Sequence, residues 1–158
     1  MQARRFINSG LVTLALAAAA CGGGDDATGP SNPPAPSGNV SASYGLSEVR
    51  AAVGKLGGGG KGLPVTFSDA SGDKLTIMGG TLVLAGDGKF DLKVQTSFNG
   101  SNTTLTDHGT YSVNGSTITF SSSKSTPRLS ASASMSGKKV TARSKFYGAT
   151  FEIDLQRK

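Results

Sequence analysis

The sequence predicts an all-β protein, an antiparallel up-and-down meander that closes into a small barrel. Apolar and polar residues alternate with a period of two through most of residues 63–158, which is typical of strands that bury one face. Turn-forming pairs, of which Asn114-Gly115 is the clearest, separate the alternating runs. The chain also has 23 glycines and no tryptophan, and its abundance of serine and threonine favours strands and turns over a helical bundle.

Residues 1–20 have the features of an export signal. Arg4 and Arg5 provide a positive start, and residues 6–20 form an apolar segment that is too short to span a bilayer. The sequence therefore predicts a signal peptide over residues 1–20, and a protein that works outside the cytoplasm.

The three alanines at residues 18–20 stand directly before Cys21 and resemble the lipobox of bacterial lipoproteins. The resemblance implies that Cys21 becomes the lipidated N-terminus and anchors the protein in the cell envelope. An ordinary secretory cut is the alternative, because the alanines also fit the A-x-A pattern. Cys21 is the only cysteine, and lipidation explains a thiol that has no internal disulfide partner. Gly22 follows the cysteine where some bacteria use Asp as an inner-membrane retention signal, which favours the outer membrane.

Residues 21–43 are predicted to be the lipidated cysteine and a flexible tether. Residues 22–38 contain four of the six prolines and no large apolar residue, so they cannot bury enough surface to fold. The folded domain is expected over residues 44–158.

Residues 44–62 are ambiguous. Apolar residues recur at helical spacing, at Leu46, Val49, Val53 and Leu56, but Gly54 interrupts them. A strand end followed by a helical turn is favoured, although the segment fits a strand or a helix. The glycine run at residues 57–62 contains G-x-G-x-x-G only trivially, and it predicts a flexible loop.

The body of the chain reads as about eight or nine strands. Alternation is clearest over residues 89–98. Further strands are predicted at Val65 and Phe67, Leu75 and Ile77, Leu82 and Leu84, Tyr111 and Val113, Ile118 and Phe120, residues 129–135, Val140 and Ala142, and residues 151–155. Such a meander buries its apolar face as a barrel or as a sandwich, and the barrel is favoured because closure removes exposed edges.

Residues 80–90, residues 109–120 and the closing strand at residues 151–155 resemble the lipocalin-like, or calycin-like, domains of small bacterial lipoproteins. The resemblance covers most of residues 63–158. It implies a closed barrel that serves as a binding module.

Two binding hypotheses follow. In the first, the barrel holds a small apolar ligand, and the candidate lining residues are Phe90, Phe98, Tyr111, Phe120, Ala131, Ala133, Ala142 and Phe151. The alternative for the same residues, a core filled by its own side chains, is favoured because small barrels are often packed in this way.

In the second hypothesis, the outer face binds anionic envelope polymers or lipid headgroups. The chain has a net charge of +6, and from Lys124 onward it has eight basic and two acidic side chains. Pairing of the last two strands would bring together the candidate patch of Lys139, Arg143, Lys145 and Arg157. Nucleic acid is not expected, because no aromatic platform lies beside these residues. A monomer is expected.

No catalytic residue, metal ligand or cofactor is assigned, and a hydrolase is only a remote alternative. His108, the only histidine, is predicted to lie on the solvent face. Strict alternation would place Asp107 inside, but a bulge at Gly109 that turns it outward is favoured. Glu152 and Asp154 alternate with apolar residues and are predicted to be solvated.

Overall fold

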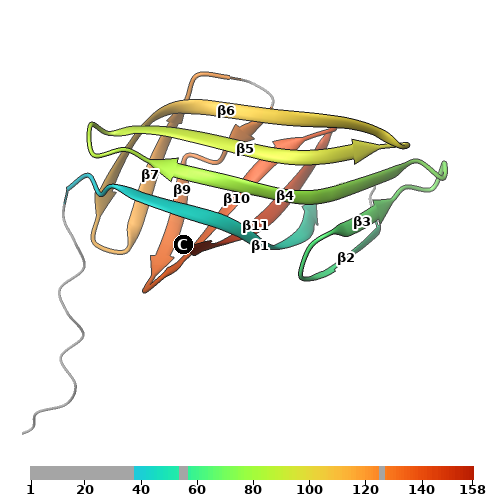
Figure 1. Cartoon of the computed structure of the whole chain (residues 1–158), viewed down its shortest axis with the longest axis horizontal. Helices are drawn as coiled ribbons and strands as arrows, with labels where there is room; N and C mark the ends of the chain where they lie inside the picture. The colour runs from blue at the N-terminus through green and yellow to red at the C-terminus, as the bar shows by residue number, and fades with distance from the viewer. Residues whose placement is uncertain (1–37, 54–56, 125–126) are drawn as a thin grey trace, which may run out of the picture. The chain divides into compact units, whose positions relative to one another are not determined.

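The computed structural model describes residues 38–53, 57–124 and 127–158. These residues form an antiparallel all-β sheet closed into an eight-stranded barrel, with no helix among them (Figure 1). The predicted fold class is therefore confirmed. The predicted signal peptide, Cys21 and the tether as far as residue 37 lie outside the described residues.

The barrel is built mainly from neighbouring hairpins. The strands are β1 (Ala42–Val53), β2 (Gly57–Lys61), β3 (Val65–Ser68), β4 (Lys74–Leu84), β5 (Lys89–Phe98), β6 (Ser101–Asn114), β7 (Thr117–Ser122), β8 (Arg128–Leu129), β9 (Ser132–Ser136), β10 (Lys139–Phe146) and β11 (Ala149–Arg157). The closed circuit runs β1, β4, β5, β6, β7, β9, β10, β11 and back to β1. Every pairing in it is antiparallel.

The hairpin of β2 and β3 is inserted where β1 and β4 separate (Figure 1). The start of β1 pairs with the end of β4, from Ala42 opposite Leu84 to Gly45 opposite Thr81. Farther along, β1 pairs with β2, β2 with β3, and β3 with the start of β4. The insertion therefore continues the ladder between the two separated strands.

The expectations for residues 44–62 were wrong in two respects. β1 continues as a strand through residue 53 where a helical turn was favoured, because it pairs with β11 along its length. The glycine run forms the strand β2 where a flexible loop was expected, since hydrogen bonding to strands on both sides outweighs the low strand propensity of glycine. The barrel also begins before residue 44, because the amide of Gly38 already donates to the carbonyl of Val113 at 3.3 Å.

Two predicted strand boundaries also differ from the structure. β4 is one strand where two were expected, and it contains a register shift between Ile77 and Gly79. The single strand expected at residues 129–135 is interrupted between β8 and β9. In this interruption the hydroxyl of Ser130 donates to the carbonyl of Ser132 at 2.8 Å, and Ala131 is exposed, not inward as predicted.

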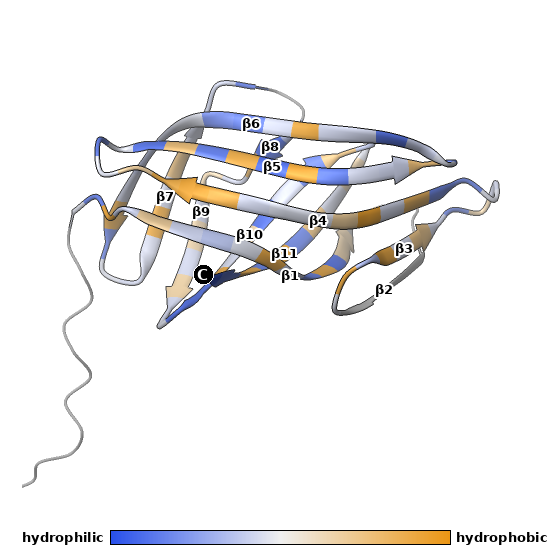
Figure 2. Ribbon diagram, viewed as in Figure 1, coloured by the Kyte–Doolittle hydropathy of each residue, from blue (hydrophilic) through white to orange (hydrophobic). Residues whose placement is uncertain are grey.

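Aromatic side chains fill much of the interior. The ring of Phe151 stacks on Phe146 with centroids 4.3 Å apart and meets the edge of Phe67 at 5.1 Å. Phe90 and Phe120 form a second edge-to-face pair at 5.0 Å. Figure 2 shows the alternation of hydrophobic and hydrophilic residues along the strands that produces this core.

Truncation of the central ring tests this packing. Phe151→Ala should lower the free energy of unfolding by about 3–5 kcal/mol, because it removes a fully buried ring and leaves a cavity between two others. Urea denaturation measures the change. Val83→Ala on β4, where the side chain is 43% exposed, is the control and should change stability by less than about 0.5 kcal/mol. Equal losses in both variants would contradict the packed interior.

Candidate functional site

The candidate ligand-lining residues lie mostly inside the barrel, where Phe90 contacts Phe120 and Phe151 contacts two other buried rings. Six of them are buried, namely Phe90, Tyr111, Phe120, Ala133, Ala142 and Phe151. Phe98 is partly buried and stacks on Tyr147 with centroids 5.2 Å apart. Ala131 is exposed and does not belong to this set. The contacts between these rings favour the filled core over a ligand cavity.

Tyr111 links two chain segments at one end of the barrel through its hydroxyl. Its hydroxyl lies 2.8 Å from the carbonyl oxygen of Ala85 and also reaches that of Val40 as a donor. Burial raises the pKa of Tyr111 above its usual value, so the hydroxyl stays protonated and able to donate. The structure therefore gives this candidate a role in holding the segment before β1 and the end of β4.

Asp107 is fully buried, so the predicted bulge that would turn it outward was wrong. β5 and β6 pair in continuous register past this point, and Gly109 instead permits close strand approach. A Cβ on Gly109 would lie 2.0 Å from the carbonyl oxygen of Ser121. His108 is exposed, as predicted.

The carboxylate of Asp107 joins two strands from inside the barrel. It accepts hydrogen bonds from the hydroxyl of Ser122 in β7 and from the amide of Leu129 in β8, the latter at 2.8 Å. In the sheet, β8 pairs with β10 alone. The buried carboxylate therefore supplies a link between β7 and β8 that the strand ladder lacks.

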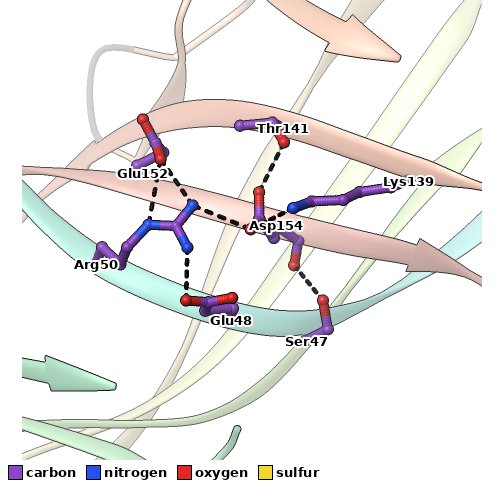
Figure 3. A network of polar contacts seen from close by, with 7 residues as sticks. All are labelled: Ser47, Glu48, Arg50, Lys139, Thr141, Glu152 and Asp154. Carbon is purple, nitrogen blue, oxygen red and sulfur yellow. Dashed lines mark hydrogen bonds and ion pairs between the residues drawn. The ribbon is translucent and has the colours of Figure 1, made fainter. Parts of the chain in front are cut away.

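Asp154 was predicted to be solvated, but its side chain is only 1% exposed. Its carboxylate accepts hydrogen bonds from Arg50 at 3.0 Å and from Thr141 at 2.7 Å, and it pairs with the Lys139 ammonium at 2.8 Å (Figure 3). These partners belong to β1 and β10, the neighbours of β11 on either side. Alternation correctly separates Asp154 from the core residues beside it but does not reveal the long side chains that cover it.

Arg50 is the centre of this network, and Figure 3 shows it between three carboxylates. Its guanidinium donates to Glu48 at 2.5 Å, to Glu152 at 2.7 and 3.2 Å, and to Asp154. Hydrogen bonds to Glu152, then to Glu48 and Asp154, raise the pKa of Arg50 further above its usual value. Arg50 is therefore a permanent cation that joins β1 to β11 where the barrel closes.

The predicted basic patch is divided between two places. β10 and β11 pair, as expected, but the ammonium of Lys139 is bound by Asp154. Lys139 and Arg157 lie near one end of this strand pair, whereas Lys145 lies beside the turn at the other end. Arg143 lies between them on β10. The four residues therefore do not form one continuous site.

A different group of cations comes together on β8 and β10. Arg128, which the sequence analysis did not single out, lies directly opposite Lys145. Arg143 lies two residues before Lys145 on the same exposed face of β10. These three side chains line a surface hollow of about 300 Å³, here called the basic cleft. Within the described residues, none of the three lies within ion-pair distance of a carboxylate.

The described residues also line a larger surface hollow, of about 400 Å³, but Glu152 lies in it beside Arg143 and it holds no cluster of cations. They contain no group of three or more His, Cys, Asp or Glu side chains placed to hold a metal ion. In the same part of the chain there is no helix with the length and apolar character needed to cross a membrane. The basic cleft is therefore the candidate binding site.

The contacts of Asp154 lead us to expect that the stability of the fold decreases at acid pH. Burial alone would raise the pKa of Asp154, but hydrogen bonds from Lys139, Thr141 and Arg50 outweigh it and hold the pKa below its usual value. A pKa lower in the folded than in the unfolded chain means that ionised Asp154 stabilises the fold above about pH 4, and that this contribution is lost as the pH falls through the folded-state pKa.

We expect Asp154→Asn to lower the free energy of unfolding at pH 7 by about 1–3 kcal/mol and to flatten its fall below about pH 5. Urea denaturation over a pH series measures both effects. Asp91→Asn, at a side chain on β5 that is 49% exposed, is the matched control and should keep the wild-type profile. An unchanged profile in Asp154→Asn would contradict the role of this network.

No family model, curated protein or solved structure matches the chain. The architecture is therefore known from the chain's own structure, whose eight-stranded closure is consistent with a small lipocalin-like barrel. Function is accordingly inferred from the geometry and charge of the basic cleft.

Proposed function

We propose that this chain is a lipid-anchored, non-enzymatic module of the bacterial cell envelope that binds an anionic envelope component through the basic cleft. The observation that carries the proposal is the grouping of Arg128, Arg143 and Lys145 on one exposed face without a carboxylate partner among the described residues. Such a group attracts anions over the whole cleft.

In the absence of a bound anion, repulsion between these cations lowers the stability of the fold. Arg128 and Lys145 are directly opposite across two antiparallel strands, and like charges in that position destabilise a sheet. On its other side, Arg143 is opposite Glu152, but Glu152 is engaged by the Arg50 guanidinium. A bound anion would relieve the repulsion, which supports a binding role for the cleft.

With the predicted lipid anchor, a modest affinity of the basic cleft for its anionic partner is sufficient for binding. Acyl chains on Cys21 and a tether of Gly, Pro and Ser residues would hold the barrel close to the envelope surface. A tethered domain meets its partner at a high effective concentration, so a weak site is occupied much of the time.

The interior packing supports an outer binding face. The buried rings of Phe67, Phe146 and Phe151 contact one another, and Phe90 contacts Phe120. A small apolar ligand within the barrel stays a prediction, and it would require these rings to separate.

Charge reversal tests the binding face. Arg128→Glu combined with Lys145→Glu should weaken retention on phosphatidylglycerol vesicles at least about tenfold, because each basic residue near an anionic surface contributes about 1 kcal/mol. Retention of the wild type should also fall as the salt concentration rises. Vesicle co-sedimentation measures both.

The matched control is Lys89→Glu combined with Lys93→Glu on β5, which changes the net charge equally at two exposed side chains. The control should lose much less retention than the cleft variant. Equal losses would show a response to net charge alone, and no retention of the wild type would refute anion binding.

The anchor is tested separately. Cys21→Ser should release the protein from membranes that have been washed at high salt, because the wash removes the electrostatic contribution of the cleft. Fractionation of the cell envelope measures the distribution. Membrane association of Cys21→Ser after the wash would contradict the lipid anchor.

A further inference from the structure

We infer that the basic cleft is a phosphate site, in which Arg128, Arg143 and Lys145 together hold one phosphate group. This inference deepens the proposed function and rests on it. It specifies the anion that the cleft selects and the groups that bind it.

The register places the three cations within reach of one anion. Opposite residues on antiparallel strands have Cα atoms about 4.5–5.5 Å apart, which applies to Arg128 and Lys145. Arg143 precedes Lys145 by two residues on the same face of β10, or about 7 Å along the strand. Arginine and lysine side chains are long enough to converge across these separations.

The backbone of Arg143 is bound to Ser130 through both its carbonyl and its amide. The amide of Ser130 donates to the carbonyl of Arg143 at 2.8 Å, and the amide of Arg143 lies 3.3 Å from the Ser130 hydroxyl oxygen. These contacts hold the interruption after β8 against β10. Consequently, the cleft is built on paired backbone and not on a free loop.

Phosphate matches the charge and the donors of the cleft better than a carboxylate does. A carboxylate carries one negative charge, whereas a phosphate monoester carries up to two and offers three oxygens as acceptors. Two guanidinium groups can each donate two parallel hydrogen bonds to such oxygens. Thr150, opposite Lys145 on β11, adds a hydroxyl at the edge of the hollow.

The ion pair of Arg50 with Glu152 leaves the cations of the basic cleft available to bind an anion. Glu152 is the cross-strand neighbour of Arg143 and the nearest acidic position on β11 that could neutralise it. Its carboxylate oxygen is bound by two guanidinium nitrogens of Arg50, at 2.7 and 3.2 Å. The negative charge of Glu152 still lies near the cleft, so its removal should strengthen phosphate binding.

The test is an amide NMR titration of the mature chain carrying Cys21→Ser, with inorganic phosphate or acetate at fixed pH and ionic strength. Phosphate should give saturable shifts at Arg128, Ser130, Lys145 and Thr150, and acetate should bind at least about tenfold more weakly. Arg128→Gln should weaken phosphate binding about tenfold, Glu152→Gln should strengthen it, and Lys89→Gln on β5 should leave it unchanged.

Equal affinities for phosphate and acetate, or a phosphate affinity that is unchanged in Arg128→Gln, would overturn the phosphate site. If vesicle retention still depended on Arg128 and Lys145, the proposed function would stand as anion binding without this selectivity. The absence of both phosphate shifts and vesicle retention would overturn both proposals.

Competition identifies the source of the phosphate. Phosphatidylglycerol vesicles that reduce the phosphate-induced shifts would support a lipid headgroup as the ligand, since both would occupy one site. Phosphate shifts that such vesicles do not reduce would support a small soluble phosphate at the same site.

Discussion

Closure of the barrel depends on the pairing of β1 with β11, and Arg50 bridges the carboxylates that this pairing brings together. The contact brings Glu48 of β1 beside Glu152 and Asp154 of β11, three carboxylates whose repulsion would oppose it. Arg50 binds all three, and Lys139 of β10 completes the neutralisation of Asp154. This junction between segments distant in the sequence makes the sheet continuous and leaves no open edge there.

The same interaction connects the fold to the proposed function. Arg50 forms an ion pair with Glu152. Glu152 lies opposite Arg143 across β10 and β11 and would otherwise be available to pair with it. As a result, the acidic side chains of β11 stabilise the closure, while Arg128 of β8 and Arg143 and Lys145 of β10 stay without ion-pair partners among the described residues. The charged side chains of these strands therefore form an ion-paired junction and a separate basic cleft, in accordance with a role in anion binding.

The barrel could be predicted from the sequence because the alternation of apolar and polar residues is a local signal. Within each strand, this alternation indicates which face is buried. β2 could not be recognised in this way, since a run of glycines has no alternation and its strand form depends on partners on both sides. The burial of Asp154 could not be predicted because it depends on side chains from other strands. Alternation places Asp107 inside, but Gly109 also fits a bulge, and only the pairing of the strands shows that Gly109 permits close approach instead. Arg128 was missed because its pairing with Lys145 follows an interrupted strand, and no local pattern indicates that register.

We propose that the barrel is filled by its own side chains and binds through its outer surface. Native mass spectrometry of the Cys21→Ser chain, recovered without detergent from the envelope of the cells that produce it, tests this proposal. The expected result is the mass of the bare chain, or of the chain with a bound phosphate-bearing group that dissociates at high salt. A bound apolar molecule that withstands high salt would contradict it, because the interior would then be a ligand cavity.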